Sequence, residues 1–236
     1  MARPKDLHFS ELPTGAHDTG ISGVTGRYST VQARNDEDGA STSVVTLPRD
    51  RRLDSVLVRE IIEGKPAAIA ELFDRYAGLV RRMLTRTLGS SYDIEDLAQE
   101  TFLTVIRRCK TLRDLDAFDS FVIGVSIRVA RNELRKRRLR RLVGLDQATD
   151  LAVAPAHDPV AREGIQRLYR ALDRMEAGSR VLFMLRHVEQ LELTELAQAE
   201  GCSLATVKRR LARANQRFEA IAAQDPVLRA FLRRQP

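Results

Sequence analysis

The chain has 236 residues and is strongly basic, with 39 Lys and Arg against 32 Asp and Glu and a formal net charge of +7. This balance favours a polyanionic partner, either nucleic acid or an acidic membrane surface. There is no tryptophan and aromatic residues make up only 5%, which disfavours single-strand binding by base stacking. No apolar run approaches the roughly 20 residues of a membrane-spanning helix, and the N-terminus lacks a signal-peptide core. We therefore expect a soluble cytoplasmic protein without membrane insertion.

Cysteines and histidines give no sign of a disulfide framework or a metal site. Cys109 and Cys202 are far apart and form no CxxC pair, and the four histidines are scattered without ligand spacing. Both cysteines are expected to be packed against apolar neighbours. The sequence also has no phosphate-binding loop and no nucleophile elbow. We therefore expect no metal, no cofactor and no catalytic residues, so the protein is not predicted to be an enzyme.

The first 52 residues differ in composition from the rest of the chain. They are rich in Gly, Ser, Thr and Asp and show no sustained hydrophobic period. Such a segment buries too little apolar surface to offset the entropy lost on ordering, so it is predicted to be disordered. Within it, docking or a brief strand at SVVTLP, residues 43–48, is the alternative to disorder.

From Asp54 onward the hydrophobic pattern is helical. Pro66 marks a helix start, because its missing N–H costs nothing in the first turn. Apolar residues then recur at i, i+3, i+4 and i+7 in three successive stretches, which predicts three amphipathic helices. Helices of this kind bury their apolar faces against one another in a compact bundle. The three stripes are Ile69, Leu72, Phe73, Tyr76, Val80 and Leu84; Ile94, Leu97, Ala98, Thr101, Phe102, Val105 and Ile106; and Phe118, Phe121, Val122, Val125 and Val129.

The helical pattern is interrupted at 143–160, where Pro155 and Pro159 occur and charge density falls. A second helical unit follows, with apolar stripes at 165–172 and 181–188. The expected fold class is therefore all-α, with two small helical domains joined by a flexible linker. The predicted organisation is a disordered extension at 1–52, a first domain at 53–142, a linker at 143–160, a second domain at 161–224 and a tail at 225–236.

The stretch LTELAQAEGCSLATVKRRLARANQRF, residues 193–218, has the pattern of a helix-turn-helix. Gly201 lies where the turn needs a positive φ, and Ser203 is placed to cap the second helix. Such a motif places its second helix in the major groove of DNA, where Arg and Lys bind guanine and Thr contacts the thymine methyl group. The alternative is an ordinary basic helical hairpin. The candidate DNA-binding residues are Ser203, Thr206, Lys208, Arg209, Arg210 and Arg213.

A second basic feature is the run RVARNELRKRRLRR at 128–141, which has eight Arg and Lys and one acid, Glu133. Basic runs of this density usually bind phosphates, with strong salt dependence. The alternative is a solvated helix end, where cations complement the helix dipole. Eight basic groups exceed what a helix end needs, so nucleic acid is favoured.

The stretch DIEDLAQETF at 93–102 is acidic within a basic protein. Acids in a first helical turn complement the helix dipole, and that alone could explain them. An acidic patch in a basic chain also favours contact with a basic protein partner. No histidine, nucleophile or metal-ligand spacing accompanies these carboxylates, so acid–base chemistry is not expected.

These three features, in this order, resemble the extracytoplasmic-function (ECF) sigma factors of bacterial RNA polymerase, which belong to the sigma-70 family. The resemblance covers about residues 54–220. Residues 68–103 and 118–141 are similar to the region-two domain of that family, and 171–218 to its region-four domain. Three departures stand out. The tryptophans usual near Val105 and Val122 are missing, MEAGSR replaces a Pro-containing turn at 175–180, and Glu192 replaces a capping Ser.

The resemblance implies a promoter-specificity subunit with two DNA-binding surfaces and one polymerase-binding surface. It places contact with the clamp helices of the largest polymerase subunit at Asp93, Glu95, Asp96, Gln99, Glu100 and Phe102. It places contact with the minus-ten promoter element at Lys110, Arg113, Arg128, Arg131, Asn132, Arg135 and Lys136. The helix beginning after Ser203 would then bind the minus-thirty-five element. An anti-sigma protein is a further partner that the family implies.

Two alternatives to this interpretation remain open on the sequence. A transcription regulator could use the helix-turn-helix alone, with residues 54–141 serving only for protein interaction. An enzyme acting on nucleic acid is a third class, which the missing metal and nucleophile motifs disfavour. The acidic stretch followed by the basic run discriminates against the regulator, which needs neither in that order.

Overall fold

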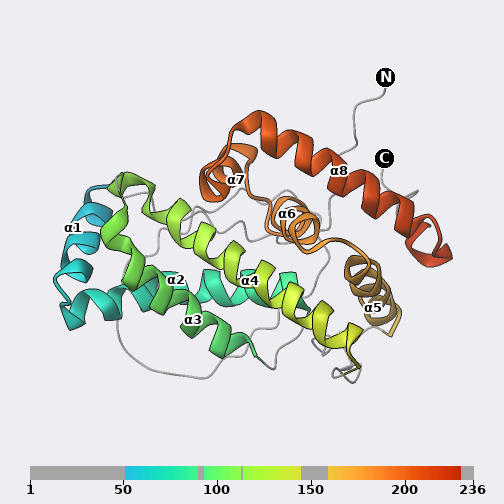
Figure 1. The fold of residues 1–236 in the computed structure, drawn as a ribbon, viewed down its shortest axis with the longest axis horizontal. Coiled ribbons are helices and arrows are strands. Elements are labelled where there is room, and N and C mark those ends of the chain that lie inside the picture. The colour runs from blue at the N-terminus through green and yellow to red at the C-terminus, as the bar shows by residue number, and fades with distance from the viewer. Residues whose placement is uncertain (1–50, 90–92, 113, 145–158, 230–236) are drawn as a thin grey trace, which may run out of the picture.

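The structure is a computed structural model and describes residues 51–89, 93–112, 114–144 and 159–229. Throughout these ranges the fold is helical, with no strand, which confirms the predicted all-α class. The disordered extension, the stretch at 43–48 and most of the linker lie outside the described residues, so their predictions stay untested. The elements are α1 Arg51–Ile62, α2 Pro66–Leu88, α3 Ile94–Arg108, η1 Cys109–Thr111, η2 Leu115–Ala117, α4 Phe118–Leu142, α5 Pro159–Asp173, α6 Ala177–His187, α7 Leu193–Glu200 and α8 Leu204–Ala222 (Figure 1).

The helix ends follow the local sequence signals. Pro66 occupies the first turn of α2, as predicted, and Gly89 ends that helix with φ 70°, its N–H donating to the carbonyl of Thr85 at 2.8 Å. Gly201 ends α7 with φ 64°. Glycine adopts this left-handed conformation without steric cost, which is why it follows so many helices.

The helix α1 was not identified as a separate element from the sequence. Its residues Leu57, Val58 and Ile61 are buried, and it packs against α2. With α2, α3 and α4 it forms the first helical unit, residues 51–144. Tyr76 of α2 is fully buried here, with its hydroxyl donating to Asp119 at 2.5 Å.

The helix α4 lies at the centre of the molecule. Six consecutive residues, from Val122 to Ile127, are buried, so this part of the helix is enclosed on all sides rather than along one stripe. It contacts α2 and α3 within the first unit, and it also contacts α6 and α7 (Figure 1). The sequence predicted only the stripe that faces α2 and α3.

The second helical unit comprises α5 to α8, residues 159–229. The rings of Phe183 and Phe218 pack 4.5 Å apart at the centre of a cluster formed by α5, α6 and α8. The first residues of the predicted C-terminal tail are helical and packed on the second unit. Asp225 caps this final helical turn, and Leu228 is buried. Leu196, Val207 and Leu211 of the helix-turn-helix instead join the apolar cluster of the first unit. The two units therefore share a continuous core.

Membrane spans and metal clusters are both missing from the part of the chain that the structure describes. No helix there is long and apolar enough to cross a membrane, and no group of His, Cys, Asp and Glu there lies close enough together to hold a metal ion. Cys109 is buried, and burial raises the pKa of its thiol, whereas Cys202 is only half-buried.

Candidate nucleic-acid and protein interfaces

The acidic helix α3 presents most of its predicted contact residues to solvent. Asp93, Glu95, Asp96, Gln99 and Glu100 are exposed. Phe102 is 2% exposed and packs against Phe73, with ring centroids 4.3 Å apart. Its side chain therefore supports the helix from the core and is not available to a partner in this arrangement.

An apolar residue that the sequence analysis did not single out lies on the same helix. Leu103 is 49% exposed and stands at i+7, i+4 and i+3 from Asp96, Gln99 and Glu100. Residues at these spacings share one face of a helix. An acidic stripe ending in an exposed leucine is suited to a basic protein surface with an apolar pocket. The sequence did contain a signal for this residue, because Leu103 lies seven residues after Asp96 and so falls on the acidic face of the helix.

Glu95 is already paired within the molecule. Its carboxylate accepts two hydrogen bonds from Arg81 of α2, each at 2.8 Å, from Nε and Nη2. This pairing with Glu95 raises the pKa of Arg81. The predicted partner-binding role therefore falls more naturally on Asp96, Gln99 and Glu100.

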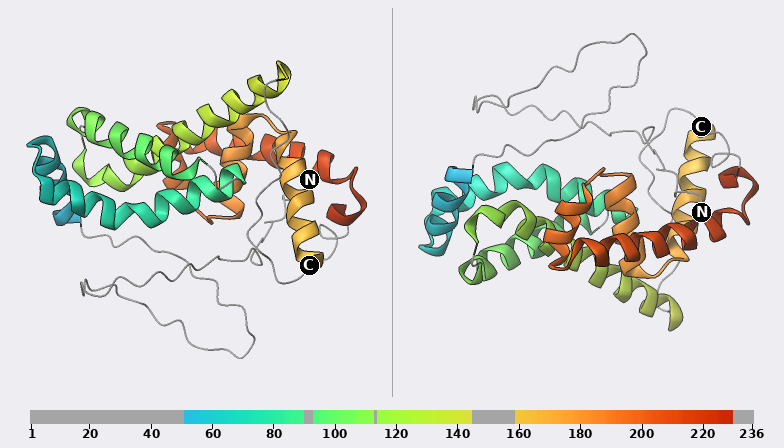
Figure 2. Two further views of the ribbon diagram at one scale, coloured as in Figure 1. Left: turned by 90° about the horizontal axis from the view of Figure 1, so that it is seen from below. Right: turned by 90° about the horizontal axis from the view of Figure 1, so that it is seen from above.

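The basic half of α4 projects from the body of the molecule in both views of Figure 2. Arg128, Asn132, Arg135 and Lys136 are exposed along it, as is Lys110 in η1. Arg128 is exposed overall, but partial burial of its side chain lowers its pKa, and the nearby cation Arg108 lowers it further. An anionic ligand here would relieve that repulsion. Arg113, another predicted contact residue, lies outside the described residues.

The charge available on this basic run is smaller than the sequence suggests. Glu133 is 6% exposed and accepts hydrogen bonds from Arg137 and Arg140, both at 3.0 Å. Arg131 is half-buried and bonds the carboxylate of Glu200 in α7. Arg141 pairs with Asp173 at 3.1 Å. The surface open to a polyanion therefore has fewer available cations than the eight basic residues of the run.

The helix-turn-helix has the predicted geometry. Ser203 caps α8 by accepting from the N–H of Thr206 at 3.2 Å, and the two hydroxyls lie 2.9 Å apart. Lys208, Arg209 and Arg213 are exposed on α8. Arg210 is also exposed, but it donates to Glu200 at 3.2 Å. Glu200 thus contacts one cation from each predicted DNA-binding helix.

We predict that Ser203→Ala destabilises the second unit by about 1 kcal/mol, because the cap of α8 is lost. Urea unfolding followed by circular dichroism measures the change in the free energy of unfolding. Gln216→Ala, at an exposed position in the same helix, is the control and should leave stability unchanged within about 0.5 kcal/mol. Equal stability of the two variants would mean that the hydroxyl does not cap the helix.

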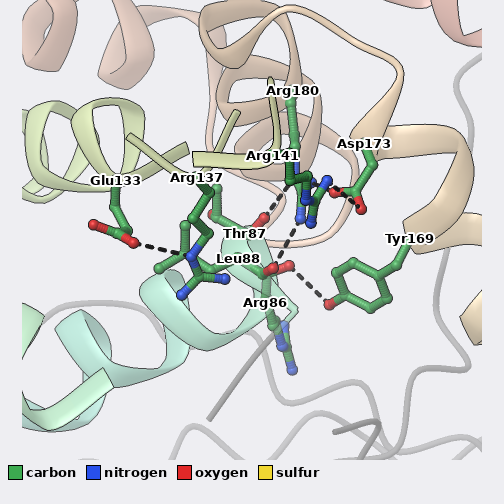
Figure 3. Close-up of polar contacts among 9 residues, drawn as sticks. All are labelled: Arg86, Thr87, Leu88, Glu133, Arg137, Arg141, Tyr169, Asp173 and Arg180. Carbon is green, nitrogen blue, oxygen red and sulfur yellow. Dashed lines mark hydrogen bonds and ion pairs between the residues drawn. The ribbon is translucent and has the colours of Figure 1, made fainter. Parts of the chain in front are cut away.

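Arg180 is a buried arginine at the contact between the two units, and the sequence analysis did not identify it. It lies in α6, is 3% exposed, and donates to the carbonyls of Thr87 and Leu88 at 2.9 Å each (Figure 3). Those carbonyls end α2, where backbone acceptors lack helical partners and the dipole favours a cation. Burial lowers the pKa of Arg180, and its ion pair with Asp173 opposes that effect. Arg180 therefore joins the two units.

Tyr169 adds a second contact at the same place. Its hydroxyl donates to the carbonyl of Arg86 at 2.8 Å (Figure 3). Its ring also lies against Gly89. A side chain at that glycine would meet the ring at 2.5 Å. Burial raises the pKa of Tyr169, consistent with a neutral hydroxyl that donates to a backbone acceptor.

Comparison with known proteins agrees with this arrangement of surfaces. The sigma-70 region 2 family matches residues 72–140, and the sigma-70 region 4 family matches residues 165–217. The ferric citrate uptake sigma factor FecI of Escherichia coli K12 is 31% identical over 150 residues, covering 61% of this chain and 84% of FecI. The sigma factor CnrH of Cupriavidus metallidurans is 24% identical over 183 residues, covering 73% and 95%.

The fold also matches a solved structure, that of CnrH in complex with the cytosolic domain of CnrY. The match has a TM-score of 0.50 at 21% identity and covers 73% of this chain and 98% of that one. The two family regions coincide with the two helical units, in the order that the sequence predicted. The chain belongs to the sigma-70 family and is an ECF-type sigma factor of bacterial RNA polymerase.

Proposed function

We propose that this sigma factor binds core polymerase and promoter DNA through three separate surfaces. The exposed face of α3 around Asp96, Gln99 and Glu100 binds core polymerase. The basic half of α4 contacts the minus-ten element, and α8 contacts the minus-thirty-five element. The observation that carries the proposal is the exposure of each charged set on a separate helix, with acids on α3 and cations on α4 and α8.

The basic surfaces suit two different tasks. Near the start of α8, Lys208 and Arg209 are placed like the side chains that reach base edges from a recognition helix. On α4, Arg128, Arg135 and Lys136 suit phosphates, which position a protein without specifying sequence. Two modest DNA-binding modules on one chain gain affinity through effective concentration. Strand opening then needs only capture of bases that are already unstacked, since flipping a base costs about a few kcal/mol.

Run-off transcription with purified core polymerase and a genomic promoter library tests the proposal. The expected result is a small set of transcripts that appear only when the protein is added, with a shared sequence at two positions upstream of their starts. Binding of DNA without any new transcript would favour the alternative, a regulator that uses its helix-turn-helix alone.

We propose two further properties that support the same role. The protein works in the cytoplasm, at the nucleoid when bound to polymerase, and contributes no catalytic residue of its own. An anti-sigma protein is a further partner, and the solved complex of CnrH with the cytosolic domain of CnrY supports this proposal. Co-purification of the protein from its native cells tests it.

Reversing the charge on α3 is expected to weaken association with core polymerase by at least about tenfold, because like charges then oppose a basic partner surface. The variant is Asp96→Lys with Glu100→Lys, both at exposed positions. Glu71→Lys with Glu219→Lys changes the net charge equally at other exposed positions and is the control. Dissociation constants from fluorescence anisotropy measure the effect. Equal affinities of the two double variants would remove α3 from the polymerase interface.

A further inference from the structure

The last turns of α4 carry three exposed apolar side chains that none of the contacts proposed above uses. Leu139 is 63% exposed, Leu142 is 77% exposed and Val143 is 59% exposed. Leu142 is the most exposed large apolar residue in the part of the chain that the structure describes. This end of α4 projects from the body of the molecule (Figure 2). Apolar side chains that gather on an exposed surface often mark a binding site.

These side chains continue the stripe of α4 that we propose contacts the minus-ten element. The members of the stripe are separated in the chain by four, three, four and three residues, and they are Arg128, Asn132, Arg135, Leu139 and Leu142. Residues at these spacings share one face of a helix. The face is polar as far as Arg135 and apolar beyond it. A duplex that lies along the polar part therefore extends towards the leucines.

The available charges around this apolar end are cations. Lys136 lies seven residues before Val143, and Arg138 lies four residues before Leu142, so one cation flanks the apolar residues on each side. Both cations are exposed, and neither forms an ion pair with a carboxylate of the described residues. Glu133, the one acid of the basic run, is buried. These surroundings favour a partner that combines negative charge with apolar groups.

The major groove of duplex DNA offers this combination. Thymine presents its C5-methyl group there, and phosphates line the groove on both sides. Leu139 and Leu142 lie four and seven residues past Arg135, which is about 6 and about 10 Å along the helix axis. At about 3.4 Å for each base-pair step, the leucines would lie about two to three base pairs beyond the site of Arg135. Because the chain continues from α4 into the second unit, these base pairs would lie on the side that faces the minus-thirty-five element.

We infer that Leu139, Leu142 and Val143 contact the C5-methyl groups of thymines in the duplex between the two promoter elements, next to the minus-ten element. This inference rests on the proposed contact of α4 with that element. Phosphate contacts by Lys136 and Arg138 position the end of the helix, and the apolar contacts give it a preference for T·A pairs. The preference is modest, because burying one methyl group changes affinity by about fourfold.

Replacing thymine with deoxyuridine tests this contact, because deoxyuridine pairs with adenine as thymine does and lacks only the C5-methyl group. The probe is a promoter from the run-off library in which the first few base pairs on the spacer side of the minus-ten element alternate between T·A and A·T. Holoenzyme formed from core polymerase and the full-length protein should bind the deoxyuridine duplex at least about fourfold more weakly than the thymine duplex. Dissociation constants from fluorescence anisotropy measure the difference. Deoxyuridine at equally many positions upstream of the minus-thirty-five element should have no effect.

Leu139→Ala with Leu142→Ala tests the same contact from the protein side. Both positions are exposed, so the double variant should fold normally. It should bind the thymine duplex about as weakly as the unmodified protein binds the deoxyuridine duplex, and it should lose most of the difference between the two duplexes. Val56→Ala with Ile62→Ala is the matched control, because it removes two apolar side chains of α1 that are 51% and 50% exposed. The control should retain the full difference.

Two results would overturn the contact with thymine while leaving the proposed function intact. One is equal affinity of the unmodified holoenzyme for the thymine and deoxyuridine duplexes. The other is a double leucine variant that distinguishes the duplexes as strongly as the α1 control does. If that variant also binds core polymerase more weakly, the apolar end of α4 contacts protein instead of DNA. Holoenzyme that binds neither duplex would contradict the proposed function itself, so the two failures are distinguishable.

Discussion

Alanine at Lys208, Arg209 and Arg213 together is expected to reduce promoter-directed transcription at least about hundredfold. Each well-placed cation on a recognition helix contributes about 1–3 kcal/mol of base discrimination or neutralises a phosphate. All three side chains are exposed on α8. Arg210 is left unchanged, because it also bonds Glu200 within the second unit, so its replacement would combine loss of DNA contact with loss of that bond. Run-off transcription from one cognate promoter measures the effect.

The matched control removes the same charge elsewhere in the second unit. Alanine at Arg162, Arg170 and Arg174, exposed positions on or next to α5, should leave promoter selection intact. Affinity for core polymerase should be unchanged in both triple variants, since we place that contact on α3. Similar losses from the two triple variants would mean that net charge, and not the α8 surface, determines promoter binding.

The salt dependence of promoter binding distinguishes base contacts from phosphate contacts. Each phosphate contact that is lost lowers the slope of log K against log salt concentration by about one. A variant that loses affinity without changing this slope has lost a base contact instead. Measuring the slope for each of the three single alanine variants therefore assigns Lys208, Arg209 and Arg213 individually.

The helices and their ends were predictable because local signals set them. Pro66, Gly201 and Ser203 act within one or two turns, and the apolar stripes of α2 and α3 repeat at the helical period. The helix α1 was missed because it directly follows a segment without periodicity, which hides its start. Local periodicity thus accounts for the elements but not for how the two units pack.

The sequence did contain one signal for this packing, which is the second apolar face of α4. The stretch FVIGVSI at 121–127 is apolar around the whole helix, whereas a surface helix needs only one apolar stripe. Ile123 and Ile127 lie outside the predicted stripe and are buried. Their burial depends on a partner more than 50 residues away in sequence, which no local pattern identifies.

The candidate site was predictable as a charge distribution but not as a set of available charges. Exposed cations on α4 and α8 and exposed acids on α3 agree with the residue pattern. The residue pattern does not show which charges are paired, because the paired residues lie at very different separations in the chain. Glu133 pairs with Arg137, four residues away, whereas Glu200 pairs with Arg131, 69 residues away. Arg180 gave no signal, since one arginine within an apolar helix has no periodic signature.

Arg180→Ala is expected to lower the free energy of unfolding by about 3–5 kcal/mol, the usual cost of breaking a buried charge pair. The variant leaves two buried carbonyls, those of Thr87 and Leu88, without their donor. Among the described residues, the carboxylate of Asp173 is then left with Arg141 alone, whose side chain is 49% exposed. Urea unfolding of the full-length protein, followed by circular dichroism, measures the change.

The conservative variant and the control make this result specific. Arg180→Lys keeps a charge near Asp173 but lacks the planar fork that serves two carbonyls at once, so it should recover only part of the loss. Arg174→Ala removes an exposed arginine that bonds the exposed Gln224, and it should cost less than about 0.5 kcal/mol. A loss below about 1 kcal/mol for Arg180→Ala would mean that the contact does not persist in solution. Because Arg180 lies in the second unit and its carbonyl acceptors end a helix of the first, its removal should also make the two units unfold in separate transitions where the unmodified protein unfolds in one.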